Sequence, residues 1–504
     1  MFRAWESFPH SKKLVLVLAG LLTLLLFLPK LTKPKESAEY RGVVQSPGGP
    51  VENAQVLIQG KGLQVVSDPK GEFLLKNARE GEPLSIAKPG FFIANSQVTR
   101  EFLRINMRSV PTQDNLDYSW VHPREGEGNC FQCHEKIVED WERSGHSHSA
   151  SSRGFKEMFK AREGAGGKPA GWSLSHEYPE GKGVCAACHA PGVKEKDPAL
   201  EDPTLARGVD GLGVHCDFCH KISGVRKQDA GLTHGRDFFQ IQRPGVDQVF
   251  FGPIRDASRD DNSFAPVFKE SLYCAACHEG TLFGVPVYTT WSEWKESPAA
   301  KEGKSCQQCH MAPAGEINFA PGHGGINRRP DAISSHQLLP GGILAMLRLS
   351  LRMDVSRETV EGAVRIHAHL TATGVGHRVP TGFIDRHLVL LVEAQDALGK
   401  KISSVRGPLL PVHAGQEWHG HPGFLFAKVL QVKGVEGPLP FWTVGPTVKD
   451  TRLEPGKPQA LEWEFPQGTK QVKLKLIYRK FWKEQEKVKG WPDGDQVVLE
   501  KILQ

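Results

Sequence analysis

Cys130-Phe131-Gln132-Cys133-His134 is the first of five C-x-x-C-H segments that decide how this chain folds. The other four begin at Cys185, Cys216, Cys274 and Cys306. Two cysteines at this spacing can form thioethers to the two vinyl groups of one porphyrin, and the adjoining histidine then lies under the iron as an axial ligand. The five segments therefore predict five covalently bound c-type haems.

These motifs use all ten cysteines of the chain. The predicted thioether residues are Cys130, Cys133, Cys185, Cys188, Cys216, Cys219, Cys274, Cys277, Cys306 and Cys309. The predicted proximal iron ligands are His134, His189, His220, His278 and His310. A zinc site made from C-x-x-C pairs needs no histidine after each pair, and a thioredoxin-like motif would occur once. No cysteine is left for a disulfide or a thiol nucleophile, and no catalytic residue is predicted.

The chain has 504 residues, enough for about three domains, and a formal net charge of +6. A basic chain often binds nucleic acid, but five haems would add about ten propionate charges and bring the assembled molecule near neutrality. No basic block or patch of interleaved aromatic residues is present. The sequence therefore predicts no nucleic-acid partner.

Residues 1–36 contain an unbroken apolar run at 14–28. As a helix this run would be about 22 Å long, shorter than a typical hydrocarbon core but longer than many signal-peptide segments. Glu36 occupies the position where a signal peptidase site needs a small residue. We expect an uncleaved membrane anchor, with a removed signal segment as the alternative. Because haem is attached to such motifs outside the cytoplasmic membrane, we expect a single-pass protein with its bulk facing the periplasm or exterior.

Residues 39–109 show short alternating stretches separated by Gly and Pro, the pattern of a small antiparallel β-sandwich. The stretches lie at 42–44, 54–58, 72–75 and 103–107. Segments 42–44, 50–56, 68–73 and 88–91 resemble the carboxypeptidase-regulatory-like domain. That resemblance implies a spacer or docking module without catalytic residues.

Residues 110–345 form the predicted haem domain, which should be loop-rich and mainly α. Polypeptide alone would pack such a region poorly, so the porphyrins should supply much of its apolar core. Segments 141–146, 213–216, 294–298, 306–311 and 334–336 resemble the multihaem cytochrome c family that includes cytochromes c-554 and c-552. The resemblance implies closely packed, mostly bis-histidine haems, with His146 and His336 as distal ligands.

Residues 346–504 alternate again and predict a C-terminal β-sandwich to about residue 483, followed by a polar tail. The predicted strands are 364–370, 387–392, 460–465 and 472–478. The segment 376–382 resembles a G-H-x-x-P-T-G motif found after such haem domains, which makes His377 a further candidate ligand.

Five six-coordinate haems need five distal ligands. After His146, His336 and His377, the next candidate is His234. The lower-ranked histidines are His176, His215, His148, His122 and His323. Residues 235–277, before the fourth motif, contain no histidine, so either a distant one reaches that iron or one haem keeps an open position. His367 and His369 share the polar face of a strand and are expected to be an exposed pair rather than a metal site.

Two functions follow from this reading. In the first, the protein is a membrane-anchored extracytoplasmic cytochrome that transfers electrons through a closely packed haem chain, between redox partner proteins in or at the membrane. In the alternative, one haem with an open position reduces a small N-oxide or oxyanion, which adds a small-molecule substrate. Electron transfer is favoured, because no C-x-x-C-K variant and no oxyanion pocket is readable. The two β modules argue against a small quinol-oxidising cytochrome.

Overall fold

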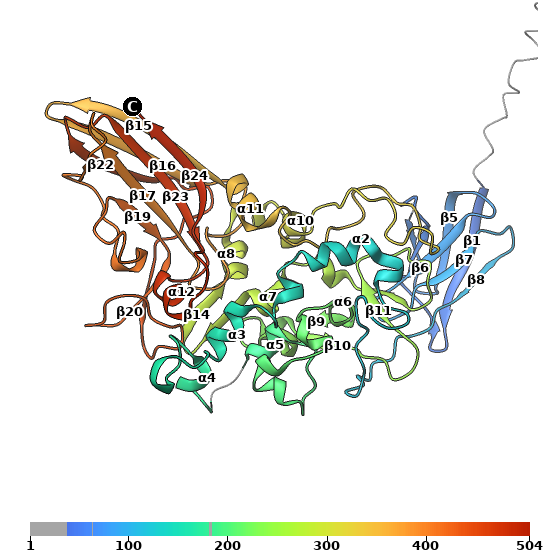
Figure 1. Ribbon diagram of the computed structural model, residues 1–504. Helices are drawn as coiled ribbons and strands as arrows, with labels where there is room; N and C mark the ends of the chain where they lie inside the picture. The colour runs from blue at the N-terminus through green and yellow to red at the C-terminus, as the bar shows by residue number, and fades with distance from the viewer. Residues whose placement is uncertain (1–37, 63, 181–183) are drawn as a thin grey trace, which may run out of the picture.

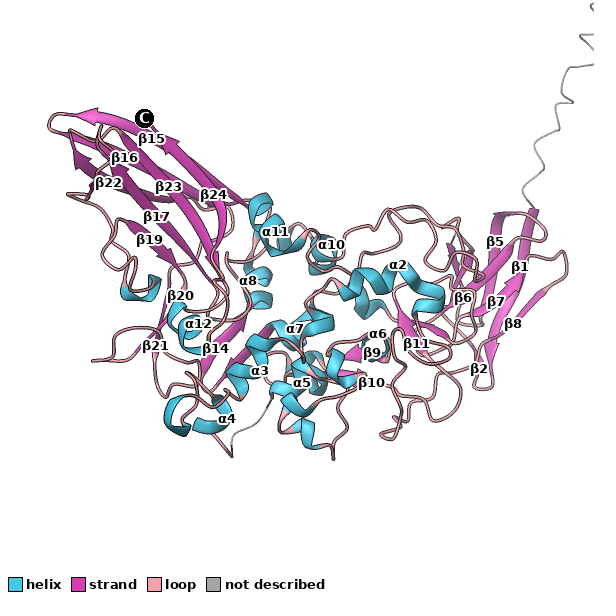
Figure 2. Cartoon of the chain, in the orientation of Figure 1, coloured by secondary structure: helices cyan, strands magenta, loops and turns pink. Residues whose placement is uncertain are grey.

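The computed structural model describes residues 38–62, 64–180 and 184–504. A helical middle region lies between two regions of strands, one at each end (Figures 1 and 2). The predicted membrane anchor at 1–36 lies outside the described residues. Among the residues that are described, no helix is both long and apolar enough to cross a bilayer.

The N-terminal region is a sandwich of two four-stranded sheets. The first sheet contains β2 (Gly49–Pro50), β1 (Ala38–Ser46), β5 (Glu72–Ala78) and β8 (Leu103–Asn106). The second contains β4 (Gln64–Val66), β3 (Gln55–Ile58), β6 (Pro83–Ala87) and β7 (Ala94–Gln97). Their inner faces bury an apolar core that includes Val44, Val56 and Leu75. This core explains the alternating pattern in the sequence, because every second residue of such a strand faces inward.

One pairing in this sandwich corrects the prediction of a purely antiparallel fold. β8 pairs with β1 in parallel, with Gly42 opposite Leu103. The chain reaches β8 from β7, which belongs to the other sheet, so it crosses between sheets and enters β8 in the direction of β1. The tight turn before β5 needs Gly71, whose φ is +75° and whose Cβ would lie 2.2 Å from the carbonyl oxygen of Val44.

The middle region is built from short helices and three two-stranded sheets. The helices are α2 (Phe131–Glu142), α3 (Arg153–Phe159), α4 (Leu174–Glu177), α5 (Cys185–His189), α6 (Cys216–Cys219), α7 (Leu272–His278), α8 (Thr290–Glu296), α9 (Pro298–Lys301) and α10 (Cys306–His310). The sheets are β9 (Ile222–Val225) with β10 (Phe239–Ile241), β11 (Phe250–Gly252) with β12 (Asn262–Phe264), and β13 (Glu279–Leu282) with β14 (Val285–Thr289). Each haem motif lies in or at the start of a helix, where one turn brings its two cysteines to the same side.

The C-terminal region is the second predicted sandwich. One sheet orders β15 (Leu351–Val360), β16 (Ala363–Ala372) and β22 (Gln459–Pro466). The other orders β18 (Lys401–Ile402), β17 (His387–Gln395), β23 (Gln471–Arg479) and β24 (Gln496–Leu503), with β19 (Gly423–Phe426) also paired to β17. A hairpin of β20 (Lys428–Gln431) and β21 (Thr447–Asp450) extends beside them. The core between the sheets includes Ile366, Leu390 and Trp463, and α11 (Gly342–Ser350) leads into β15.

The predicted polar tail after residue 483 is wrong. Residues there form α12 (Lys483–Lys489) and the strand β24, which pairs antiparallel with β23. The charged side chains of α12 misled the prediction because several of them bond to other parts of the fold. Lys489 is fully buried, and its Nζ donates to the carbonyl oxygens of Glu157, Ala170 and Trp172 at 2.8, 3.0 and 2.7 Å. The C-terminal segment is thereby tied to the middle region.

Candidate haem-binding cavity

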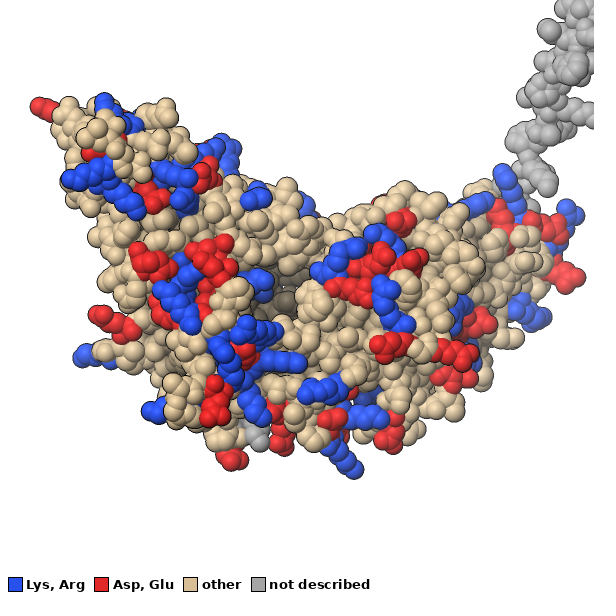
Figure 3. Space-filling model, in the orientation of Figure 1, with Lys and Arg blue, Asp and Glu red and all other residues tan. Residues whose placement is uncertain are grey.

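A cavity of about 2450 Å³ lies in the middle region and reaches the C-terminal sandwich. All ten motif cysteines and all five motif histidines line it. Pockets for one ligand usually measure about 300–1,000 Å³. This cavity therefore suits several large groups that share one space, as the five motifs require. The visible face is hollowed between the middle region and the C-terminal sandwich, and charges of both signs are mixed over it (Figure 3).

Four motif histidines are oriented by backbone carbonyls. Each hydrogen-bonds a carbonyl oxygen through Nδ1: His134 with Phe319 (2.8 Å), His189 with Ser149 (2.9 Å), His220 with Phe251 (2.7 Å) and His310 with Leu338 (2.9 Å). A carbonyl oxygen can only accept, so Nδ1 carries the proton and the lone pair lies on Nε2. This is the tautomer that a proximal iron ligand needs.

Burial favours the neutral form of five histidines that line the cavity. It lowers the pKa of His146 and His220 to about 4 and that of His278 to about 3. The pKa values of His134 and His189 are lowered for the same reason. A metal-binding imidazole must be unprotonated, so an apolar surrounding favours ligation.

Two motif histidines face a second histidine across the cavity. The rings of His310 and His377 are 6.2 Å apart between centroids and 16° from parallel. Those of His278 and His146 are 6.3 Å apart and 36° from parallel. Two imidazoles on opposite sides of one metal ion, with bonds of about 2 Å, have ring centres roughly 6 Å apart. Both pairs therefore have the spacing of bis-histidine ligation.

The other predicted distal ligands are less directly placed. His336 lines the cavity, its Nδ1 donates to the carbonyl of Ser334 at 3.1 Å, and it is an electrostatic neighbour of His220. His234 also lines the cavity, with its Nδ1 buried and unpartnered. Its ring lies 3.2 Å from where a Cβ of Gly280 would be, just after the fourth motif.

The lower-ranked histidines divide into two groups. His148, His215 and His323 line the cavity, whereas His176 and His122 do not. Nδ1 of His215 accepts from the backbone N–H of Phe218 at 3.2 Å, so the proton is on Nε2 and no lone pair remains for iron. His323 is an electrostatic neighbour of His134.

Sulfur side chains from different motifs touch one another in the cavity. The touching pairs are Cys130 with Cys216, Cys188 with Cys277, and Cys274 with Cys306. With haem attached these sulfurs would be thioethers, so haems held by touching motifs would be neighbours. Tyr273 links the third motif to the fourth, because its hydroxyl donates to the carbonyl of Cys219 at 3.3 Å. The fourth motif is thus a branch point with three neighbours.

The loop that carries His377 is held by an ionic clamp that the sequence did not reveal. Glu293 on α8 accepts from the backbone N–H of Arg378 at 3.1 Å and from the guanidinium of Arg452. Arg452 is 7% exposed and also pairs with Asp450 at 2.7 Å. These bonds join the haem region to the sandwich beside His377. The only sequence signal was that Glu293 directly precedes the Trp294 segment of the family resemblance.

Two possible metal sites outside the cavity are already neutralised. His367 lies on β16, and its ring nitrogens are 3.6 Å from a carboxylate oxygen of Glu358 and 3.2 Å from one of Glu462. These are ion-pair contacts at the protein surface.

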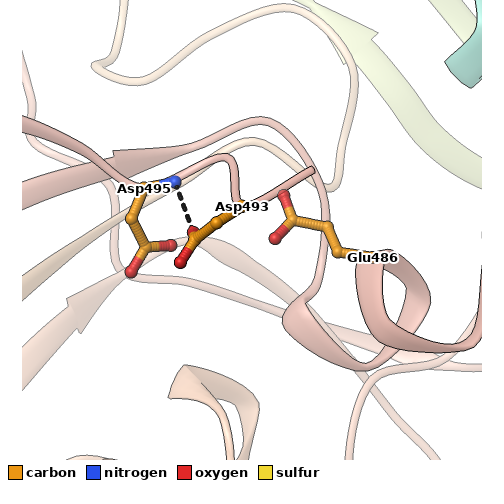
Figure 4. A group of neighbouring side chains, drawn as sticks. All are labelled: Glu486, Asp493 and Asp495. Carbon is orange, nitrogen blue, oxygen red and sulfur yellow. Dashed lines mark hydrogen bonds between the residues drawn. The ribbon is translucent and has the colours of Figure 1, made fainter. Parts of the chain in front are cut away.

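Glu486, Asp493 and Asp495 converge beside α12 (Figure 4). The Nζ of Lys483 lies 3.5, 2.5 and 3.1 Å from their respective carboxylates. Arg479 pairs with Asp495 as well, at 2.6 Å. The ammonium group takes the place of a cation, so this cluster is an internal ion-pair network.

Comparison with known proteins agrees with the motifs. Residues 129–221 match the family model described as cytochrome c554 and c-prime. The fold is similar to the crystal structure of a penta-heme cytochrome c552 from Thermochromatium tepidum, with a TM-score of 0.54 and 22% identity over 74% of this chain and 97% of that chain. No curated protein sequence matches.

Proposed function

This chain contains a multihaem cytochrome c domain, and from that premise we propose that it is an extracytoplasmic pentahaem electron-transfer protein. All five motifs line one cavity with their cysteines and histidines directed to it, which supports a complement of five haems. Haem c, when bound, supplies one-electron chemistry at its iron. The polypeptide would hold, orient and bury these haems.

The observation that carries the proposal is the set of sulfur contacts between motifs. The first motif adjoins the third, the second adjoins the fourth, and the fourth adjoins the fifth. Groups attached at touching sulfurs are held as close neighbours, which is the arrangement that electron exchange between redox centres requires.

The axial ligands we propose follow from the histidine positions. His146 serves the iron of His278, and His377 serves that of His310. His336 is the candidate for the iron of His220, of which it is an electrostatic neighbour. His323 is the candidate for the iron of His134.

His234 is the candidate for the second haem, since it lies between α5 and α7. Gly235 follows it, and a Cβ at Gly235 would lie only 2.1 Å from the carbonyl oxygen of Ala187 in the second motif.

We further propose that residues 1–36 anchor the protein in the cytoplasmic membrane, with the bulk on the outer side. The apolar run at 14–28 and the absence of a small residue at position 36 support this. The partners would then be redox proteins in or at the membrane.

A second function is favoured by one observation at His189. Phe155 stacks on its ring at 3.8 Å and 5° from parallel, and among the described residues no histidine ring pairs with it. An iron at His189 without a distal ligand would be open to a small N-oxide or oxyanion.

Carbon monoxide distinguishes the two functions, because it binds only iron with an open position. The electron-transfer proposal expects the optical spectrum of the reduced holoprotein to be unchanged by carbon monoxide. If the wild type forms a carbon monoxide adduct equal to one haem, and His234→Ala forms the same amount, the enzyme is favoured. In the electron-transfer protein the same substitution should create such an adduct, and His176→Ala, outside the cavity, should not.

A further inference from the structure

The end of the C-terminal sandwich that reaches the cavity carries two cations, one just before β17 and one just after β23. Leu388 on β17 pairs with Tyr478 on β23, and His387 pairs with Arg479. Continuing this antiparallel register places Arg386 opposite Lys480. Since side chains alternate between faces, Arg386 and Lys480 lie on the same face as Tyr478. All three of these residues line the cavity.

Neither cation is balanced by a carboxylate. Within the described residues, no acidic side chain forms an ion pair with Arg386 or with Lys480. The guanidinium of Arg386 makes one long hydrogen bond, from Nη1 to the carbonyl of Thr381 at 3.4 Å. Guanidinium offers five donors in a planar fork, so most of its binding capacity faces the cavity unused.

The Tyr478 hydroxyl supplies a second, independent observation. This side chain is 1% exposed, and its oxygen is buried with no hydrogen-bond partner in the described part of the chain. The core around its ring includes Leu388 and Leu476, so phenylalanine would fill the core equally well. Leaving a hydroxyl buried and unpaired costs about 1–3 kcal/mol. A ligand that accepts from this hydroxyl would remove that cost.

Tyr288 on β14 locates the cluster relative to the haem motifs. Its hydroxyl has Cys188, Cys185 and Cys277 among its electrostatic neighbours, together with Arg386. Burial raises the pKa of Tyr288, so it remains a neutral donor. Arg386 therefore lies near the second and fourth motifs, at the sandwich side of the cavity.

We propose that Arg386, Tyr478 and Lys480 form an anion-binding site that takes a carboxylate or a small oxyanion at the boundary between the cavity and the sandwich. The two cations provide the charge, the guanidinium fork provides paired donors, and the tyrosine hydroxyl fixes orientation. The inference rests on the proposed haem loading of the cavity. The occupant is either a haem propionate, held permanently, or a free oxyanion that enters from solution.

The test uses the holoprotein as wild type, Arg386→Gln and Arg357→Gln. Arg357 is the matched control, because it lies on β15 outside the cavity and its guanidinium also donates only to carbonyls, those of Lys470 and Thr469. Haem content is measured first. Each protein then undergoes an equilibrium redox titration, followed by titration with sodium nitrite and with phosphate while the Soret band is recorded.

A propionate occupant predicts that Arg386→Gln moves the midpoint potential of one haem downward, because the oxidised haem is repelled less, while no protein responds to added anion. A free oxyanion predicts a saturable Soret change in the wild type that needs about tenfold more anion in Arg386→Gln, the effect of losing one charge-assisted hydrogen bond. Arg357→Gln should match the wild type in both measurements.

The site is refuted if Arg386→Gln, with full haem content, matches the wild type in potential and in anion response. Should Arg386→Gln fail to fold, Tyr478→Phe replaces it, since this change removes only the hydroxyl and keeps the core shape. Unchanged potentials and unchanged anion response in that variant would then refute the site. Failure of the haem proposal itself would be distinguishable, because the wild type would contain too few haems before any anion is added.

Discussion

The imidazole of His377 lies opposite that of His310 with the ring centroids 6.2 Å apart, although the two residues belong to different regions of the chain. His310 ends α10 in the middle region, whereas His377 lies on a loop between β16 and β17 of the C-terminal sandwich. Nδ1 of His377 donates to the carbonyl of Arg378 at 3.0 Å, which leaves Nε2 free to bind iron. Under the proposed ligation the sandwich would therefore supply an iron ligand to the haem site.

Replacing His377 with alanine should convert one haem from low spin to high spin. The fifth iron would lose its distal nitrogen, while the other haems keep theirs. Electron paramagnetic resonance of the oxidised holoprotein measures this as one haem equivalent of high-spin signal. His369→Ala on the exposed side of β16 is the control and should leave the spectrum unchanged. An unaltered spectrum in His377→Ala would remove the sandwich from the site.

The substitution Gly376→Ala should displace the neighbouring ligand His377 while leaving the His377 side chain itself unchanged. A Cβ there would lie 2.9 Å from Cδ1 of Trp294 and 3.2 Å from Cβ of Ala299. Overpacking of this kind costs about 1–3 kcal/mol. Gly376→Ala should lower the chemical unfolding midpoint and add high-spin signal, whereas Gly468→Ala, with nothing within 4 Å, should do neither. Equal behaviour of the two variants would contradict the packing described.

Removing the ionic clamp at Glu293 should lower the free energy of unfolding more than removing an exposed ion pair. Glu293→Gln leaves the buried Arg452 with less compensation and weakens the hold on the His377 loop, at a cost on the order of 3 kcal/mol. Asp354→Asn removes the partner of Arg352 in an exposed pair and should cost about 0–1 kcal/mol. Denaturant unfolding compares the two, and a similar small loss in both would show that the clamp does not stabilise the interface.

The contribution of Asp385 to stability should fall between about pH 4 and pH 8. Burial raises the pKa of this carboxyl to about 8, while the unfolded chain has a value of about 4. In that window the folded state keeps a proton that the unfolded state has lost, so rising pH favours unfolding. Asp385→Asn should reduce the difference between unfolding midpoints at pH 5 and pH 8. The control Glu436→Gln, at an exposed position, should leave the difference between the two unfolding midpoints unchanged. If the Asp385 carboxyl were ionised in the folded protein, Asp385→Asn would leave that difference unchanged as well.

The sequence predicts those features of the fold and the site that depend on residues close together in the chain. The haem motifs, the strands at 364–370 and 472–478, and the candidacy of His146 and His377 rest on residues close together in the chain. The structure places the motifs and these histidines in one cavity, and the two strands in the two sheets of the C-terminal sandwich. The choice of partner is not local. Nothing near His146 indicates that it faces His278, because that pairing depends on how the turn after α2 lies against the end of α7 in three dimensions.

Other features escaped for the same physical reason. The strand β24 and the helix α12 appeared as a polar tail, since their charges pair with residues distant in sequence, such as Lys489 with the carbonyl of Glu157. The cluster of Arg386 and Tyr478 becomes visible only when β17 and β23 are in register. Unpaired groups cannot be recognised until their surroundings are known.

The most direct test of the account is the intact mass of the purified mature protein, measured beside the mass of the polypeptide alone. Five covalently attached haems predict a mass increase of five haem units, with no cysteine left to react with an alkylating agent. A mass equal to that of the bare polypeptide, or full alkylation of Cys130 and its counterparts, would contradict it.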